Sequence, residues 1–220
     1  MALAQLGAGW TPLLERVLAA LAPNIAAPDA FFSLAGQLLD LTVSWNEKMD
    51  LTAAKSSEEL VDLLFSDAAA LFGLGELDAG ASWLDVGSGS GAPGLPIALL
   101  GPRLRVTLLE PMQKRVAFLR TAVGTLGVNV EVTRGRAEDA PEQSADVAIS
   151  RATLPPPEWL RAGARLAKES VWVLLAREEP PTLGGWAIHT DFSFAWPLTG
   201  RARRLVAFRP VAQGGCGKIW

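Results

Sequence analysis

The sequence predicts an α/β fold in which a parallel sheet carries helices on both faces, preceded by a small helical segment. From Trp83 onward, short apolar runs alternate with segments of helical periodicity, which is typical of parallel strands joined by crossover helices. Residues 10–72, in contrast, show helical periodicity throughout. The polar residues that do not fit the packing pattern fall at the ends of the apolar runs, where open α/β sheets bind ligands.

The composition of the 220 residues is that of a globular chain with one sizeable core. Half of the residues are hydrophobic and the formal net charge is −3, so any surface for nucleic acid has to be a local patch. One cysteine and one histidine argue against disulfides, a metal site and Ser-His-Asp catalysis. Because Glu15 and Arg16 interrupt the first apolar run, we expect neither a signal peptide nor a membrane span, and a cytoplasmic location.

Two main helical stretches are predicted in the N-terminal segment, which we place at residues 1–80. Apolar residues recur at steps of three and four over 31–45, which indicates one buried helix face. Ser56 and Glu59 have the spacing of a capping box at the start of a second apolar stripe. The stretch 45–53 between the two is too polar for a core, and it is either a plain connection or a functional loop.

Five strands and a closing hairpin are predicted in the second segment, residues 81–220. The strands cover 83–86, 104–110, 128–133, 146–150 and 171–176, and the hairpin pairs 186–194 with 203–208. Helices follow the first, second and fourth strands, because Pro93, Pro111 and Pro155 each stand at a position where proline favours a helix start.

The stretch 83–94 combines a strand, a glycine-rich turn and a helix start. Gly87, Gly89 and Gly91 follow Asp85 at alternate positions, so the backbone can turn sharply and approach a ligand closely. The free N–H groups of such a turn favour a carboxylate or a phosphate. Read from Gly87, the spacing is that of S-adenosylmethionine sites; read from Gly89, it is the dinucleotide fingerprint GxGxxG. The turn alone leaves both cofactors open, and also a turn without a ligand.

Glu110 ends the second strand at about the distance from the glycine turn at which an acid binds a ribose. Its carboxylate can accept hydrogen bonds from both ribose hydroxyls, which suits the adenosine of either cofactor. The alternative is an exposed carboxylate at a strand end. Two further polar sites, 136–138 and 150–151, follow the third and fourth strands.

Clusters of basic residues flank this edge of the sheet and offer phosphate contacts to RNA. They are Lys114, Arg115, Arg134, Arg136 and Arg151, with Arg201, Arg203 and Arg204 on the closing hairpin. The alternative is a set of solvated surface charges. Trp45 has two interpretations as well, stacking on a base or belonging to the apolar face of its helix.

These motifs together resemble the RsmG (GidB) family, methyltransferases that modify position 7 of a guanine in small-subunit ribosomal RNA. The resemblance covers residues 30–178. It is carried by Trp45-Asn46 with Leu51-Thr52-Ala53, by Leu84 through Gly89 with Pro93-Gly94-Leu95-Pro96, by Glu110 with Lys114-Arg115 and Phe118-Leu119, by Arg136-Ala137-Glu138 and by Ser150-Arg151-Ala152. It implies a Rossmann-like class I methyltransferase sheet and S-adenosylmethionine as the cofactor.

The resemblance also implies roles for individual residues. The cofactor-binding set is Asp85, Gly87, Gly89, Gly91, Ala92, Glu110, Ala137, Glu138 and Arg151. Gly87 and Ala92 would contact the cofactor through the backbone, and Glu110 would hold the ribose. Ala137 and Glu138 would flank the adenine. Arg151 would close the site. Because N7 of guanine has a free lone pair, the reaction needs no general base, and Arg151 is the one candidate for a direct part in catalysis.

The sequence departs from the family pattern at four places, mostly on the side of the acceptor. Ala92 replaces a larger apolar residue, Leu64 stands where the family has a histidine, and Arg177 stands where it has a lysine. Lys168-Glu169-Ser170 stands where the family has a pair of glycines. The departures leave alternatives open: methyl transfer to a small molecule or a protein, an inactive cofactor-binding paralogue, or an NAD-binding protein. Under the leading hypothesis the partner is ribosomal RNA or the small ribosomal subunit, and the protein is a monomer.

Overall fold

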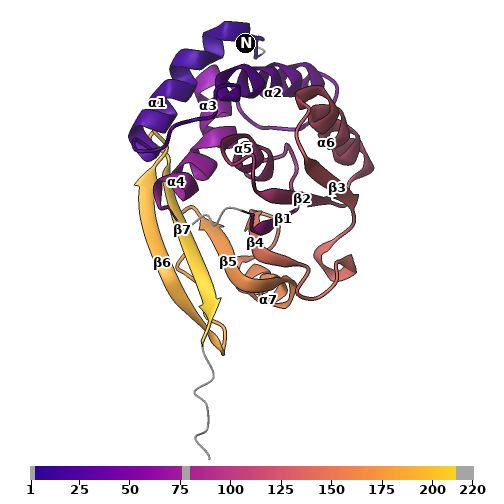
Figure 1. Cartoon of the computed structure of the whole chain (residues 1–220), viewed down its shortest axis with the longest axis vertical. Coiled ribbons are helices and arrows are strands. Elements are labelled where there is room, and N and C mark those ends of the chain that lie inside the picture. The colour runs from indigo at the N-terminus through magenta and orange to yellow at the C-terminus, as the bar shows by residue number, and fades with distance from the viewer. Residues whose placement is uncertain (1–2, 76–79, 212–220) are drawn as a thin grey trace, which may run out of the picture.

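The computed structural model describes residues 3–75 and 80–211; Cys216 lies outside these ranges. Within them, one seven-stranded sheet has the order β3-β2-β1-β4-β5-β7-β6 (Figure 1). The strands are β1 (Ser82–Val86), β2 (Arg105–Glu110), β3 (Val130–Arg134), β4 (Ala145–Arg151), β5 (Ala167–Leu175), β6 (Trp186–Ala195) and β7 (Ala202–Pro210). Neighbouring strands are parallel from β3 to β5, and β7 is antiparallel to both β5 and β6.

The observed strands lie close to the predicted ones, and β5 differs most. It begins at Ala167, before the expected start at residue 171, because Ala167 already pairs with Ala145 of β4. The chain therefore enters the sheet directly at the end of α7 (Pro156–Leu166), with no loop between helix and strand.

Helices cover both faces of the sheet, as the sequence predicts. Helices α5 (Gly94–Leu100) and α6 (Gln113–Leu126) pack on β1, β2 and β3 from one side, and α7 packs on β4 and β5 from the other (Figure 1). Successive residues of β1 face opposite sides, as in any strand. Trp83 thus belongs to the core under α5 and Leu84 to the core under α7. The Rossmann-like sheet is confirmed.

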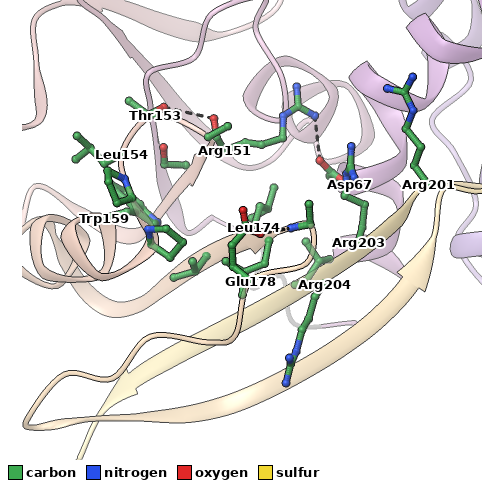
Figure 2. Close-up of a pocket in the computed structure, with 18 of the residues that line it drawn as sticks. Asp67, Arg151, Thr153, Leu154, Trp159, Leu174, Glu178, Arg201, Arg203 and Arg204 are labelled. Carbon is green, nitrogen blue, oxygen red and sulfur yellow. Dashed lines mark hydrogen bonds and ion pairs between the residues drawn. The ribbon is translucent and has the colours of Figure 1, made fainter.

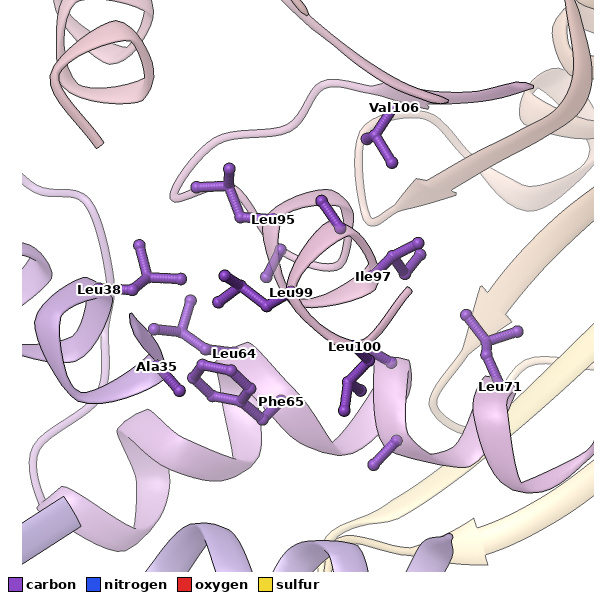
Figure 3. Close-up of a cluster of buried hydrophobic side chains, with 14 of the residues drawn as sticks. Ala35, Leu38, Leu64, Phe65, Leu71, Leu95, Ile97, Leu99, Leu100 and Val106 are labelled. Carbon is purple, nitrogen blue, oxygen red and sulfur yellow. The ribbon is translucent and has the colours of Figure 1, made fainter. Parts of the chain in front are cut away.

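The N-terminal helices enlarge the core on the α5 side. They are η1 (Gly7–Trp10), α1 (Thr11–Leu21), α2 (Phe31–Asn46), α3 (Ser57–Val61), the π-helical turn η2 (Asp62–Ser66) and α4 (Asp67–Gly73). Figure 3 shows Leu38 of α2, Leu64 and Phe65 of η2, and Leu95 and Leu99 of α5 gathered in one buried cluster. None of the helices in the described ranges is long and apolar enough to span a bilayer.

Trp45 belongs to this core. Its indole meets Phe118 of α6 edge to face, with the ring centroids 5.7 Å apart, and it packs against the buried cluster. An indole held between two helices in this way is a packing residue. The structure therefore favours the core interpretation over stacking on a base.

Half of the predicted capping box forms. Ser56 Oγ accepts a hydrogen bond from the N–H of Glu59 at 3.2 Å and caps α3. The side chain of Glu59 does not return the bond to Ser56. Its Oε2 instead accepts from the N–H of Lys55 at 2.8 Å, and its Oε1 accepts from Arg201 at 2.7 Å. Glu59 therefore joins the helix start to the β6–β7 hairpin, a long-range contact that spacing alone does not predict.

The turn between β6 and β7 is fastened to the same helix by a second acid. Asp62 is fully buried, and its carboxylate accepts hydrogen bonds from the N–H groups of Leu198 and Thr199 and from the hydroxyls of Thr199 and Ser66. Satisfied buried carboxylates of this kind are costly to disrupt. The N-terminal helices and the C-terminal hairpin are therefore packed as one body with the sheet.

Candidate functional site

A cavity of about 380 Å³ opens beside the glycine-rich turn, at the carboxyl ends of β1 and β2. Five residues of the predicted cofactor-binding set line it, namely Gly87, Gly89, Ala92, Glu110 and Arg151. Its volume lies in the range of small-molecule sites. The strand order reverses between β1 and β4, and open α/β sheets bind their ligands at such a point. We call it the first cavity.

The turn reaches the first cavity because its glycines adopt left-handed backbone conformations. Gly87 has a φ of 72° and Gly89 a φ of 55°. A Cβ atom at Gly87 would lie 2.2 Å from Thr153 Oγ1, which leaves no room for it. A Cβ atom at Gly89 would meet nothing closer than the carbonyl oxygen of Gly87, at 3.8 Å. The space in front of Gly89 is therefore open to a ligand.

Glu110 lies at the end of β2 with only 1% of its surface exposed. Its Oε2 accepts a hydrogen bond from the N–H of Gly89 and its Oε1 accepts one from the N–H of Met112, both at 2.9 Å. Each oxygen of a carboxylate has a second lone pair for a ligand hydroxyl. The alternative of an exposed strand-end carboxylate is therefore wrong. Met112, half exposed at the rim, is a wall residue that the sequence analysis missed.

A second cavity of about 280 Å³ adjoins the first. The residues common to both are Gly87, Pro111 and Thr153. Ala137 and Glu138, the residues predicted to flank an adenine, line the second cavity. Arg165 of α7 holds their loop from behind, because its guanidinium donates hydrogen bonds to the carbonyl groups of Ala137 and Ala140. The structure thus brings the turn, Glu110 and the 137–138 loop to one edge of the sheet.

Asp85 and Gly91 lie behind the turn and line neither cavity. Asp85 Oδ2 accepts a hydrogen bond from the N–H of Gly94 at 3.0 Å, at the start of α5. A Cβ atom at Gly91 would lie 2.5 Å from Leu95 Cδ1, within the core. We therefore assign these two residues to support of the turn, in place of the cofactor contact that the resemblance implies.

Burial raises the pKa of Asp85 to about 7, and its Oδ1 has no hydrogen-bond partner in the described chain. The folded-state pKa of Asp85 lies above its unfolded-state value. The contribution of Asp85 to the free energy of unfolding is therefore complete below about pH 4, and it is lost as the pH rises through 7. We expect the free energy of unfolding of Asp85→Asn, relative to the wild type, to increase by on the order of 4 kcal/mol between pH 4 and pH 8. Urea unfolding at both pH values measures this, and a constant difference would contradict the raised pKa.

The loop after α2 supplies another wall of the first cavity. Asn46 Oδ1 accepts hydrogen bonds from the N–H groups of Leu51 and Thr52, at 2.9 and 3.0 Å, and so bends the loop back on itself. This bend brings Leu51, Thr52 and Ala53 to the glycine turn. The stretch 45–53 is therefore a wall of the site as well as a connection between helices.

A third cavity, of about 530 Å³, adjoins the first (Figure 2). The two share Leu63, Arg151, Ala152 and Thr153. The remaining walls come from the end of β5, from the loop before α7 and from Trp196, Arg201, Arg203 and Arg204 near the hairpin. Sequence reasoning selected the arginines. It missed Trp159 and Trp196, whose residue types and local spacing carry no signal of a site. It also missed Asp67, for which the available signal was its place three residues after Leu64, where the family has a histidine.

Thr153 lines all three cavities and was also missed. Its hydroxyl donates a hydrogen bond to the carbonyl oxygen of Val86, at 3.1 Å, which places the side chain over Gly87. The available signal was its position two residues after Arg151, in the loop that leaves β4.

Arg151 stands between the first and third cavities. Its Nη1 donates hydrogen bonds to the carbonyl oxygen of Leu63 at 2.6 Å and to Asp67 Oδ2 at 2.9 Å. Figure 2 shows the guanidinium turned toward Asp67. Because the ion pair is largely buried, with Asp67 1% exposed, the alternative of a solvated charge is wrong for Arg151. Among the other basic residues, Arg115 lines the first cavity and Arg136 lines the second, whereas Lys114 and Arg134 are exposed.

Comparison with protein families assigns the chain. The family described as GidB, rRNA small subunit methyltransferase G, matches residues 33–179. The chain belongs to the GidB family. The ribosomal RNA small subunit methyltransferase G of Myxococcus xanthus is 37% identical over 161 residues, which cover 71% of this chain and 69% of that protein. The protein of the same name from an Anaeromyxobacter species is 32% identical over 209 residues, covering 89% of this chain and 95% of that protein.

Solved structures with lower sequence identity to this chain share its fold. An S-adenosylmethionine-dependent methyltransferase from Aquifex aeolicus superimposes with a TM-score of 0.54 at 19% identity, covering 76% of this chain and 98% of that one. A structure from Escherichia coli described as a methyltransferase gives 0.53 at 19% identity, covering 66% and 86%. The sheet of this GidB family member is therefore of the methyltransferase type.

The departures from the GidB pattern at Leu64, Ala92 and Arg177 lie in different surroundings. Leu64 is fully buried in the core between α2 and α5 and lines none of the three cavities (Figure 3). Ala92 lines the first cavity. Arg177 is exposed beyond β5, next to Glu178, which lines the third. Leu64 therefore places an apolar side chain in the core where the family has a histidine, and this difference does not alter the walls of the three cavities.

Proposed function

We propose that this protein transfers a methyl group from S-adenosylmethionine to N7 of a guanine in the RNA of the small ribosomal subunit. The observation that carries the proposal is the adjacency of two cavities in a GidB family chain. The first has the glycine turn and Glu110, and it shares Arg151 and Thr153 with the larger third cavity. A donor site and an acceptor site side by side are what group transfer requires.

The residues of the first and second cavities fit S-adenosylmethionine. Both oxygens of Glu110 can accept ribose hydroxyls while they hold the turn. The open space in front of Gly89 leaves its side of the turn free for the amino-acid part of the cofactor. In the second cavity, Ala137 offers an apolar contact to a flat adenine, and Glu138 offers an acceptor for its amino group.

Positioning is the main task of the protein in this reaction. The bound cofactor supplies a methyl group on a positively charged sulfur, which leaves as a neutral thioether. N7 of guanine has an in-plane lone pair at neutral pH, so no side chain has to remove a proton. Correct placement of two reactants is worth up to about 7–11 kcal/mol of the barrier. Arg151 and Thr153, each held by hydrogen bonds to other elements, are the residues that align the two cavities.

The third cavity suits an unpaired purine of an RNA strand. Leu154, Pro155 and Leu174 give it apolar walls, and Arg201 and Arg203 line it as well. Proteins that recognise RNA bases take them from single-stranded or looped regions, with apolar or aromatic contacts to the base and cationic contacts to the phosphates. This arrangement places phosphate-binding groups beside a base-sized space.

The test is methyl transfer from tritiated S-adenosylmethionine to small ribosomal subunits, and to bare small-subunit RNA, from a strain without the modification. We expect label in the RNA, recovered as 7-methylguanosine by mass spectrometry of its nucleosides. Label in a small-molecule or protein fraction of a lysate, with none in RNA, would replace the acceptor. Calorimetry supplies the cofactor control, because binding of NADH instead of S-adenosylmethionine would contradict the proposal.

We also propose that residues 1–80 and 81–220 act as one unit, as a monomer in the cytoplasm. Leu63 and the 51–53 loop from the first segment line the cavities formed by the second, so the two segments build the site together. Size-exclusion chromatography with light scattering should therefore give the mass of a single chain, 23.3 kDa.

A further inference from the structure

Two buried acids, Asp62 and Asp67, lie on the helix that runs from α3 through η2 to α4. In an α-helix, residues five apart point about 140° away from each other. A π turn closes its hydrogen bonds five residues on, so residues five apart lie closer to one face than they do in an α-helix. The turn Asp62–Ser66 therefore directs both carboxylates toward the C-terminal part of the chain. Single π turns within helices are frequent at functional sites.

Asp67 connects the first cavity to the third. Its Oδ2 accepts a hydrogen bond from Arg151 Nη1 and its Oδ1 accepts one from Trp196 Nε1, each at 2.9 Å. Arg151 lines both cavities and Trp196 lines the third. The carboxylate is 1% exposed, so both bonds are shielded from water and hold their partners firmly.

The indole of Trp196 in turn positions Arg203, a cation at the wall of the third cavity. The guanidinium of Arg203 lies over the indole, 3.7 Å from its centroid, in a cation–π contact. Arg203 Nη1 donates to the carbonyl oxygen of Ala202, and no ion pair of Arg203 with a carboxylate is found in residues 3–75 and 80–211. Its guanidinium therefore lies at the wall of the third cavity, in a position set by Trp196.

We propose that Asp67 is a positioning residue for methyl transfer. One oxygen sets the guanidinium of Arg151 at the junction of the two cavities, and the other sets the Trp196–Arg203 pair that faces the acceptor. The proposal rests on the proposed function, in which the first cavity holds the methyl donor and the third holds the guanine. Both oxygens of Asp67 are taken up by Arg151 and Trp196, so we assign its effect to the alignment of donor and acceptor.

Asp62 provides the matched control. It is an equally buried carboxylate on the same helix, and it holds the same hairpin through Leu198 and Thr199. It makes no contact with Arg151 or Trp196 among its hydrogen bonds. A purely structural effect of removing a buried charge from this helix therefore shows in Asp62→Asn as much as in Asp67→Asn.

The experiment compares kcat, KM for the small subunit and Kd for S-adenosylmethionine in the wild type, Asp67→Asn and Asp62→Asn. For Asp67→Asn we expect kcat to fall about 100-fold, the effect of a misplacement of about 1 Å, with KM and Kd within about threefold of the wild type. For Asp62→Asn we expect Tm to fall and kcat to stay within about threefold. An equal fall of kcat in both variants, or a change confined to KM and Kd, would overturn the proposal.

A second variant tests one of the two hydrogen bonds of the Asp67 carboxylate by itself, and it can be used if Asp67→Asn does not fold. Trp196→Phe keeps a smaller aromatic ring under Arg203 and removes the N–H donor, so kcat should fall about tenfold; an unchanged kcat would overturn the role of this bond. In Asp67→Asn the new amide N–H₂ group is a donor that faces another donor, either the Arg151 guanidinium or the Trp196 indole N–H. Trp196→Phe removes the indole N–H, so the amide can turn its N–H₂ group to that side and keep its oxygen toward Arg151. The double variant should therefore recover to about the level of Trp196→Phe, whereas the product of the two single losses would contradict the proposal.

The activity of the wild type separates the proposal for Asp67 from the proposed function. If it methylates the RNA and Asp67→Asn does so at the same kcat, the proposal for Asp67 is wrong and the proposed function stands. If the wild type transfers no methyl group to RNA, the proposed function fails and the role of Asp67 fails with it.

Discussion

Replacing Gly89 with valine should raise the Kd for S-adenosylmethionine by about 100-fold or more. The φ of 55° is unfavourable for any residue with a Cβ atom, and more so for a β-branched one. The added methyl groups would occupy the open space of the first cavity that we assign to the cofactor. Overfilling a site costs about 1–3 kcal/mol, and the shifted turn also loses its bond to Glu110. Calorimetry measures the change.

Gly127→Val is the control for backbone strain. Gly127 ends α6 with a φ of 63°, and a Cβ atom there would meet nothing within 4 Å. The two substitutions should therefore lower the free energy of unfolding by similar amounts, of about 1–2 kcal/mol. Only Gly89→Val should weaken binding. Equal cofactor affinity in the two variants would mean that the ligand space lies elsewhere.

Glu110→Ala should weaken binding of S-adenosylmethionine by about 1–3 kcal/mol, or about 5- to 150-fold in Kd. The variant loses the acceptors for the ribose, and it also leaves the N–H groups of Gly89 and Met112 without their partner. Glu131→Ala is the control, since Glu131 is an exposed acid on the neighbouring strand β3, outside the first cavity. A Kd that is unchanged in Glu110→Ala would remove this residue from the site.

The donor half of the candidate site could be predicted because its residues are close in sequence or repeat at strand ends. Gly87, Gly89 and Glu110 were selected from the turn and the strand that follows it, and all three line the first cavity. Asp85 and Gly91 were selected by the same pattern, yet they lie behind the turn. A one-dimensional spacing does not say which side of a turn faces the ligand.

The arginines of the third cavity were selected from the sequence, but the contacts that hold them could not be predicted. Asp67, Arg151 and Trp196 come from a helix, a strand end and a hairpin that are far apart in the chain, and they meet only when the sheet and the N-terminal helices pack. The π turn that directs Asp67 toward them follows from that packing, because the apolar stripe alone predicts an ordinary helix.

The sequence by itself determined the order of strands and helices, the glycine turn and the acid beside it, since periodicity and turn chemistry are local properties of the chain. The tertiary structure decided the rest. It formed the third cavity and placed one buried carboxylate between the guanidinium of Arg151 and the indole of Trp196. Contacts of that kind depend on how separate elements pack in three dimensions, and they leave no regular spacing in the sequence.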